Sequence, residues 1–181
     1  MARLPILDQS TAPGKSKELL AAVQSKMKMT PNLTKVMANS PAVLEGYLGF
    51  SGALAGGVLD PKLRELLALA VGQSNECQYC VSAHTVLGKM AGLPESELFA
   101  GRKGNSALPK FGAALSFAKN VVASRGKASP AEVQSLRDAG FSDGEIAEII
   151  SHVALNIFTN YFNNILDVDV DFPKVDLSKA A

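Results

Sequence analysis

Apolar residues recur along most of the chain at intervals of three and four positions, the spacing that places side chains on one face of an α-helix. The stretch 61–74 shows this most clearly, with an apolar stripe of Leu63, Leu66, Leu67, Ala70 and Val71. Alternation typical of strands is scarce, and the patch from Asp167 to Val170 is too short to build a sheet. The pattern therefore predicts an all-α protein.

Pairs of a capping residue and a proline mark several helix starts, because proline fits the first helical position and has no N–H to leave unpaired. Four such pairs are Thr30-Pro31, Ser40-Pro41, Asp60-Pro61 and Ser129-Pro130, and Ser142 with Glu145 adds a capping box. The predicted helices are 14–28, 32–38, 42–56, 61–74, 78–91, 94–100, 108–124, 130–138 and 143–166. Gly92 ends the fifth, and residues 101–105 are predicted to form a loop between two helical halves.

A chain of 181 residues is long enough to bury a core and is predicted to form a single domain over 1–181. The tail, about 168–181, is expected to lie extended over a neighbouring subunit or the surface. Hydrophobic residues make up 47% and charged residues only 19%, which favours a homo-oligomer that covers apolar surface.

The charge and the N-terminus exclude several classes of protein. The net charge is +1 without basic runs, so we expect no nucleic-acid partner. The N-terminus lacks the apolar core of a signal peptide, and no apolar run reaches transmembrane length. We therefore expect no membrane partner and a cytoplasmic location.

Both cysteines of the chain, Cys77 and Cys80, lie within eight positions of His84, one of its two histidines. On a helix these three side chains would fall within an arc of about 60°. His84, one turn from Cys80, could take the thiol proton. A helix N-terminus ahead of Cys77 would lower the pKa of the thiols, whereas the negative charge of Glu76 would raise it. Cys77 could then close on an oxidised Cys80 to form a disulfide.

A pair of cysteines at this spacing also occurs in inert cores, zinc sites, haem attachment sites and thioredoxin folds. Two inert buried cysteines remain possible, since free cysteine packs as a small hydrophobe. A closed zinc site needs four ligands, and His152 is the only histidine left to complete one, so no metal is expected. No histidine directly follows Cys80, which excludes haem attachment, and no βαβ pattern surrounds the pair, which excludes a thioredoxin fold.

Two further residues invite a functional interpretation. Glu65 lies on a helix that is apolar nearly all round, so it either ends a proton relay from His84 or is an ordinary solvated residue of the first turn. His152 lies in a strongly apolar helix, where a core or interface histidine is favoured over a catalytic one. The same helix carries asparagines at turn-like spacing, which predict a polar seam or a subunit contact: Asn156, Asn160, Asn163 and Asn164.

The spacing Glu-x11-Cys-x2-Cys-x3-His, formed by Glu65, Cys77, Cys80 and His84, resembles the core motif of the AhpD-like alkylhydroperoxidases, within the carboxymuconolactone decarboxylase superfamily. The flanks resemble the peroxidase-related branch: Pro31-Asn32-Leu33, Thr159-Asn160-Tyr161-Phe162-Asn163 and Val170-Asp171-Phe172-Pro173. The resemblance covers most of the chain and is most specific over about 44–93.

The resemblance implies an all-helical bundle of eight to nine helices that assembles into trimers or hexamers and needs no cofactor. It implies that Cys80 attacks the peroxide and Cys77 resolves the sulfenic acid to a disulfide. His84 would activate the thiol, linked directly or through water to Glu65. The best-known family peroxidases carry a histidine just before the second cysteine; Tyr79 stands there in this chain, so one member of their proton relay is missing.

The leading functional hypothesis is a peroxidase that reduces hydrogen peroxide or organic hydroperoxides and is restored by a dithiol protein or a small thiol. The alternative is a redox protein that exchanges disulfides with a partner or senses oxidants. A decarboxylase is disfavoured, because superfamily members with that chemistry generally lack the Cys-x2-Cys pair.

Overall fold

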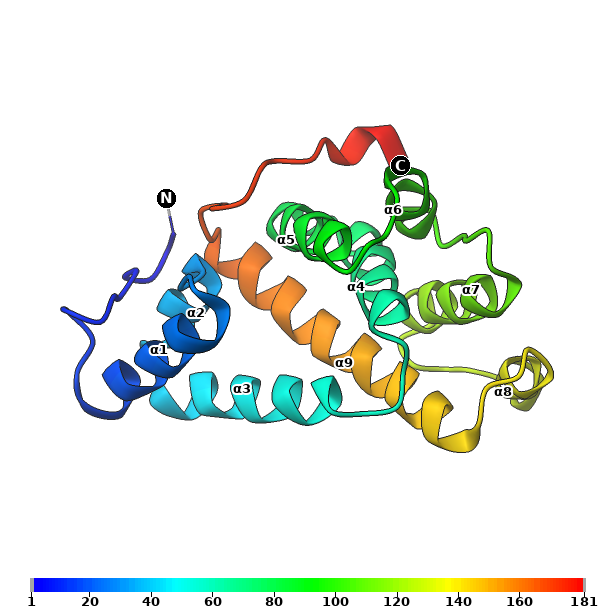
Figure 1. Cartoon of the computed structure of the whole chain (residues 1–181), viewed down its shortest axis with the longest axis horizontal. Coiled ribbons are helices and arrows are strands. Elements are labelled where there is room, and N and C mark those ends of the chain that lie inside the picture. The colour runs from blue at the N-terminus through cyan, green and yellow to red at the C-terminus, as the bar shows by residue number, and fades with distance from the viewer. Residues whose placement is uncertain (1, 181) are drawn as a thin grey trace.

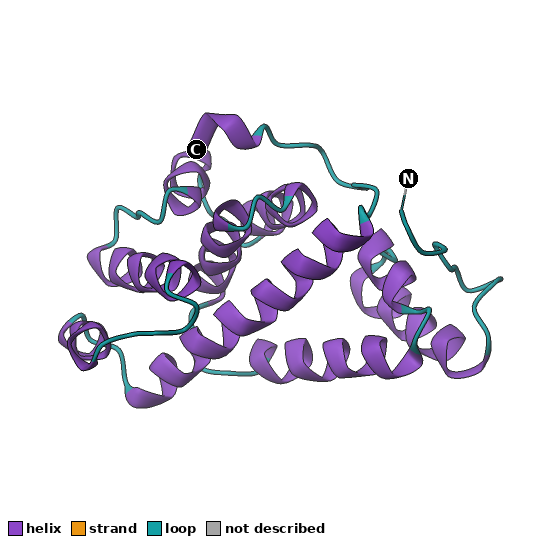
Figure 2. Ribbon diagram, turned by 180° about the vertical axis from the view of Figure 1, so that it is seen from behind, coloured by secondary structure: helices purple, strands orange, loops and turns teal. Residues whose placement is uncertain are grey.

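The computed structural model describes residues 2–180, which form an all-helical protein with no strand in that range (Figures 1 and 2). Met1 and Ala181, the ends of the predicted domain and tail, lie outside the described residues. The described helices are α1 (Gly14–Met27), α2 (Asn32–Met37), α3 (Pro41–Ala55), α4 (Pro61–Ser74), α5 (Gln78–Met90), α6 (Glu95–Arg102), α7 (Pro109–Ala123), α8 (Pro130–Asp138) and α9 (Asp143–Leu166), followed by a 3-10 turn, Leu177–Ala180. The all-α prediction is confirmed, and every predicted helix boundary lies within two residues of the observed one.

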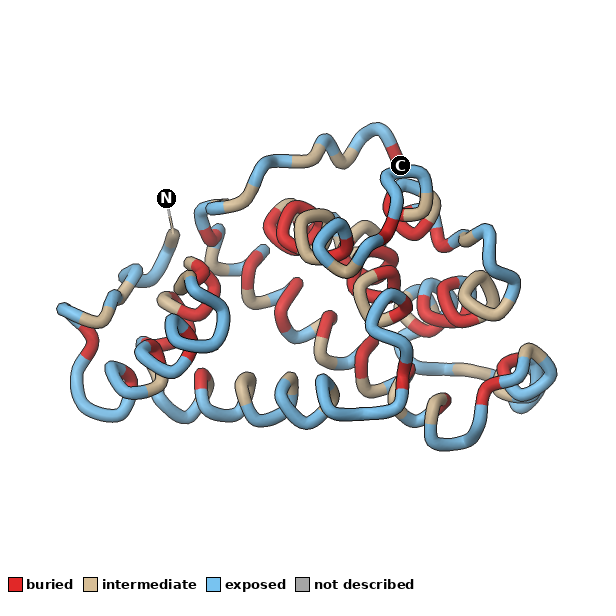
Figure 3. Tube along the Cα trace, viewed as in Figure 1, coloured by how far each residue is buried: buried red, intermediate tan, exposed pale blue. Residues whose placement is uncertain are grey.

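Helix α4 forms the centre of the larger hydrophobic core. Every residue from Leu66 to Gly72 is buried, because α5, α6, α7 and α9 pack around this helix (Figure 3). The long α9 runs diagonally across the molecule, between α3 and the α4–α5 pair (Figure 1). A second, smaller core joins α1, α2 and α3 to the start of α5, and it includes Cys77 and Cys80. The start of α5 therefore lies where the two cores meet.

Local capping explains most helix starts. The side chains of Ser40, Asp60 and Ser129 each accept a backbone N–H of the helix that follows, with proline at its first position. The predicted capping box of Ser142 with Glu145 is also present. The prediction for Thr30 is wrong: Pro31 occupies the cap position of α2, and the Thr30 hydroxyl donates to the side chain of Gln24 instead.

The first N–H groups of α2 are bound by residues far away in the sequence. The Asn32 N–H donates to Oδ2 of Asp171 at 2.8 Å, and the Leu33 N–H donates to the Tyr79 hydroxyl at 3.2 Å. The Tyr79 hydroxyl in turn donates to Oδ1 of Asp171 at 2.7 Å. The tail and α5 thus provide the cap that Thr30 was expected to supply.

The predicted loop 101–105 begins two residues too early, because α6 continues through Arg102. Arg102 is buried, and its guanidinium donates to the Gln73 side chain and to the carbonyls of Asp176 and Leu177. The tail therefore lies across the chain's own α5 and α6, irregular and without helix over residues 168–176 as expected, and only its last residues, Leu177–Ala180, form a 3-10 turn. Its backbone is also bound at Val175, whose carbonyl accepts from Gln78 and whose N–H donates to Ser82.

Candidate functional site

A disulfide bond joins Cys77 and Cys80 at the start of α5. Cys77 is the cap residue of this helix, and its Sγ accepts the Cys80 N–H at 3.2 Å. The predicted helix start beside the pair is thus observed, and it presents an N–H dipole to the Cys77 sulfur. Glu76 adopts a left-handed backbone with φ of 51° at the turn between α4 and α5 and is exposed, so water screens its charge from the sulfurs.

The two sulfurs differ in what surrounds them. Cys77 is fully buried, whereas Cys80 is 3% exposed and lines a small pocket of about 80 Å³. The pocket walls are mainly apolar and include Leu33, Ala83, Leu87 and Phe172. His84 lines the same pocket, so the predicted base and the second cysteine share one solvent-accessible space.

Asn163 of α9 contacts the disulfide directly. Its Nδ2 donates to the Cys80 Sγ at 3.3 Å, and the residue is buried. Sequence reasoning placed Asn163 only in a polar seam or a subunit contact. The seam is observed, since three of its four asparagines are buried within the chain: Asn156, Asn160 and Asn163. Their periodic spacing was the available signal, but it did not reveal the contact with Cys80.

A hydrogen bond joins Glu65 of α4 to His84 of α5. His84 Nδ1 lies 2.8 Å from Oε2 of Glu65, and both side chains are about three-quarters buried. A carboxylate accepts the Nδ1 proton, which leaves Nε2 of a neutral imidazole free to act as a base. The interpretation of Glu65 as an ordinary solvated residue is wrong, because its carboxylate is bound to His84 and is mostly buried. A proton relay through these two residues stays a prediction. All four predicted site residues therefore lie together at the α4–α5 contact.

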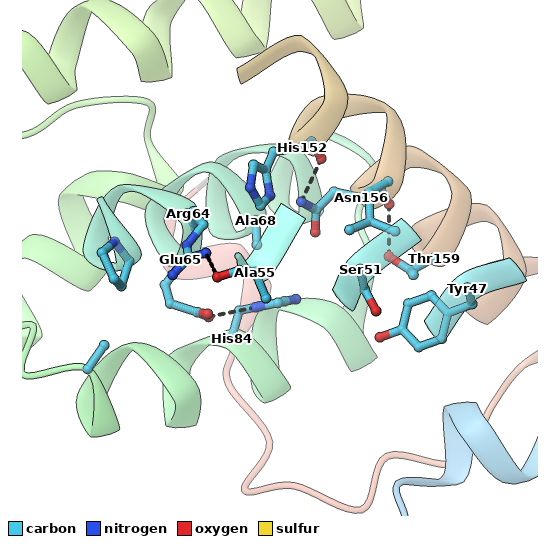
Figure 4. A pocket seen from close by; sticks show the side chains of 13 residues that line it. Tyr47, Ser51, Ala55, Arg64, Glu65, Ala68, His84, His152, Asn156 and Thr159 are labelled. Carbon is cyan, nitrogen blue, oxygen red and sulfur yellow. Dashed lines mark hydrogen bonds and ion pairs between the residues drawn. The ribbon is translucent and has the colours of Figure 1, made fainter. Parts of the chain in front are cut away.

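A second pocket, of about 270 Å³, lies on the other side of His84 (Figure 4). We call it the histidine pocket; its polar lining comes from α3, α4, α5 and α9 and includes Tyr47, Ser51, Glu65, His84, His152 and Thr159. Tyr47, His84 and Thr159 also line the pocket of Cys80, so these three residues form a shared wall.

His152 is buried, as the apolar pattern of α9 predicted, but it is not a satisfied core histidine. It lines the histidine pocket together with Glu65 and His84, and its Nε2 has no hydrogen-bond partner among residues 2–180. Burial and the nearby Arg64 guanidinium lower the pKa of His152, so its imidazole is neutral at pH 7. Sequence reasoning missed this placement, because nothing local in α9 indicates which pocket a buried histidine faces.

The described chain offers few other sites. Within residues 2–180 there is no group of three or more His, Cys, Asp or Glu side chains arranged to hold a metal ion. No helix in the same range is long and apolar enough to cross a membrane.

Comparisons with known proteins agree with this geometry. Residues 41–124 match the carboxymuconolactone decarboxylase family, a range that contains Glu65, both cysteines and His84. A peroxidase-related protein from Ralstonia eutropha JMP134, described as an alkylhydroperoxidase AhpD core, superimposes with a TM-score of 0.85, 23% identity and coverage of 94% of this chain and 92% of that one. The matched range is just under half of the chain, and the fold is that of the AhpD core.

Other similar proteins are more varied. A peroxidase-related protein from Silicibacter sp. TM1040 has a TM-score of 0.80, with 22% identity over 92% of this chain and 88% of that one. The debrominase Bmp8, a variant of which is known in complex with 2,3,4-tribromopyrrole, has a TM-score of 0.78, with 17% identity over 93% of this chain and 91% of that one. An uncharacterised Haemophilus influenzae protein is 49% identical over 45 residues, a match that spans 24% of this chain and 40% of that protein.

Tyr79 stands where the peroxidases that the sequence resembles carry a histidine, and its hydroxyl binds α2 and the tail. Its hydroxyl is occupied by Asp171 and the Leu33 N–H, and its ring packs edge-on against Phe172 at 5.7 Å between centroids. Burial raises the pKa of Tyr79 above its ordinary value, and the Asp171 carboxylate raises it further. The phenol therefore stays protonated near neutral pH, and it joins α5, α2 and the tail.

We expect Tyr79→Phe to lower the free energy of unfolding by about 1–3 kcal/mol, because the Leu33 N–H and Asp171 lose a partner. Urea unfolding measures this. Tyr161→Phe is the control, since Tyr161 is 54% exposed and its change is expected to stay within about 0.5 kcal/mol. The rate at which hydrogen peroxide oxidises the cysteine pair should change less than about twofold. A tenfold slower oxidation at unchanged stability would instead place Tyr79 in the relay.

Proposed function

We propose that this chain is a thiol-dependent peroxidase that reduces hydrogen peroxide or organic hydroperoxides by a Cys80 sulfenate and a Cys77–Cys80 disulfide. One observation carries the proposal: Cys80, already joined to Cys77, lines a pocket together with a histidine that is bound to a carboxylate. Nucleophile, resolving thiol, base and orienting group are thus all present within one site.

The first step needs a thiolate and a proton for the leaving oxygen. Nε2 of His84 takes the Cys80 thiol proton, and the thiolate attacks one peroxide oxygen. The O–O bond breaks, the sulfur becomes a sulfenic acid, and the other oxygen takes the proton from His84 and leaves as water or an alcohol. The Asn163 amide donates to the Cys80 sulfur and stabilises its negative charge before attack.

The second step uses Cys77. Its thiol attacks the Cys80 sulfenic acid, the S–O bond breaks, and one water leaves as the disulfide forms. A dithiol reductant, either a protein or a small thiol, then supplies two electrons by disulfide exchange. Attack at Cys80 is favoured because that sulfur is the accessible one, and the Cys77 thiolate is a good leaving group because the Cys80 N–H stabilises it.

The test is to mix the fully reduced chain with hydrogen peroxide and to follow its oxidation by stopped flow and intact mass. We expect the disulfide to form at least about 10²-fold faster than glutathione is oxidised at the same pH, because an activated thiolate outpaces a free thiol. Oxidation at the pace of glutathione would contradict the peroxidase. The alternative function, disulfide exchange with a partner or oxidant sensing, would then be favoured over the peroxidase, since the same disulfide supports it.

Further expectations complete this proposal. We propose that the chain is one domain over 1–181, acts in the cytoplasm and forms a homo-oligomer, either a trimer or a hexamer. Exposed apolar side chains on α9 and beside α3 support association with further copies: Val58, Phe158, Tyr161 and Ile165. A decarboxylase remains the least favoured activity, because the site is built around two cysteines.

A further inference from the structure

We propose that the histidine pocket binds a neutral organic molecule with an apolar body and one hydroxyl or hydroperoxyl group, which hydrogen-bonds to Nε2 of His152. The pocket is separate from that of Cys80, although they share the wall of Tyr47, His84 and Thr159. Its identification as the site that holds the alcohol product, or a hydroperoxide before it moves to Cys80, rests on the proposed function. The binding itself does not.

The first argument is the unpaired nitrogen. His152 is only 7% exposed, and a buried polar atom without a hydrogen bond is rare in folded proteins because it has lost its hydrogen bond to water. Its Nε2 is covered and has no partner among the described residues, while the side chain lines the histidine pocket (Figure 4). A ligand in that pocket supplies the missing hydrogen bond once the imidazole turns its Nε2 towards the pocket.

The second argument concerns the charge of the ligand. The Glu65 carboxylate already pairs with His84, and Nη1 of Arg64 donates to the carbonyls of Leu54 and Ala55 at the end of α3. Arg64 and Glu65 carry opposite charges and both line the pocket, so the fixed charges of the lining sum to zero, and the His152 imidazole is neutral. No net charge remains to attract an anion or a cation, so the pocket favours a neutral molecule.

The third argument selects the polar group. In a neutral imidazole Nε2 is either a donor or an acceptor, depending on the tautomer. A hydroxyl or a hydroperoxyl group can both donate and accept, so it satisfies Nε2 in either tautomer. A ketone or an ether can only accept and would fit one tautomer only.

The fourth argument sets the size of the ligand. A cavity of about 150 Å³ holds benzene, and the histidine pocket measures about 270 Å³. Ala55, Ala68 and Leu155 supply apolar contacts within it. A ring with a short side chain fits this volume, whereas the pocket of Cys80, at about 80 Å³, holds little more than the peroxide group.

The experiment measures the binding of benzyl alcohol and toluene to the oxidised full-length chain by NMR titration. The two probes differ by one hydroxyl group, and neither reacts with a disulfide. We expect His152→Leu to weaken benzyl alcohol binding about 3- to 10-fold and to leave toluene binding unchanged or tighter, because one net hydrogen bond is worth about 0.5–1.5 kcal/mol. Equal effects on both probes, or no effect on benzyl alcohol, would overturn the role of His152.

A second variant places the ligand in the pocket even if His152→Leu does not fold. Ser51 is half-buried on α3, so Ser51→Leu fills the pocket from its edge and should abolish binding of both probes. Ser135→Leu, on an exposed position of α8 away from the pocket, is the matched control and should change neither affinity. The histidine pocket is refuted as the binding site if the probes still bind to the Ser51→Leu variant. It is also refuted if the wild-type protein binds no benzyl alcohol.

These outcomes are independent of turnover. Benzyl alcohol binding that depends on His152, in a chain that reacts with peroxide no faster than glutathione does, would keep the binding site and reject the peroxidase. Fast reaction with hydrogen peroxide together with no probe binding would keep the peroxidase and reject the site.

Discussion

Replacing Cys80 by serine is expected to reduce peroxide turnover to the uncatalysed background, a loss on the order of 10³-fold or more, because Cys80 supplies the one thiol among the residues that line the pocket with His84. A serine hydroxyl cannot be oxidised to a sulfenic acid and is a far weaker nucleophile than a thiolate near neutral pH. Turnover is measured with hydrogen peroxide in excess and dithiothreitol as the reductant.

Cys77→Ser provides the complementary result. This variant should consume one peroxide per chain and then stop, because Cys80 reacts but no thiol remains to resolve it. Intact mass should show one added oxygen atom, and dimedone should trap the sulfenic acid on Cys80. The opposite pattern, with Cys80→Ser retaining the single event, would assign the attack to Cys77. That outcome is physically reasonable, since the helix N–H donates to the Cys77 sulfur, so the pair of variants discriminates between two real alternatives.

The fold was predictable because its signals are local. Proline after Ser40, Asp60 and Ser129 marks helix starts that the structure reproduces, since each cap needs only its neighbours in the sequence. The apolar residues of α4 likewise predicted a helix buried on nearly all sides. Thr30 failed as a cap because Asp171 and Tyr79, both distant in the sequence, bind the start of α2 instead.

The site could be predicted only in part, for a related reason. Glu65 and His84 were linked by the spacing of a known motif, and the structure brings them within 2.8 Å. Asn163 and His152 belong to α9, and only the packing of α9 across α4 and α5 brings them to the cysteines and the pocket. Helical periodicity predicts that a residue is buried, but not which distant helix it meets.

The position of the tail over the surface was expected, but its contacts could not be predicted, because they are made by backbone carbonyls. Arg102, Gln73 and Gln78 bind the carbonyls of the segment from Val175 to Leu177, and carbonyl groups carry no sequence signal. A buried arginine after a glycine resembles a loop in the sequence alone. Its burial becomes intelligible only once the tail is seen to supply the acceptors that a desolvated guanidinium needs.

His84→Gln is expected to slow the oxidation of the reduced cysteine pair by hydrogen peroxide about 10²- to 10⁴-fold, the usual contribution of general acid–base catalysis. Glutamine retains an N–H donor for Glu65, which limits structural damage, but it cannot hold a proton near neutral pH. Glu65→Gln should have a smaller effect, about tenfold, because the amide still positions the imidazole but no longer stabilises the imidazolium formed during proton transfer.

The double variant shows whether the two residues act as one unit. If Glu65 acts through His84, the double variant should be no slower than His84→Gln alone, since a relay is already broken when one member is missing. Glu95→Gln is the control for loss of a carboxylate, because Glu95 forms an exposed pair with Lys89 away from the cysteines. Stopped-flow oxidation of all four variants provides the rates, and urea unfolding shows whether each is folded. Fully additive losses would mean that Glu65 acts on Cys80 independently of His84, and wild-type rates in Glu65→Gln would remove the carboxylate from the mechanism.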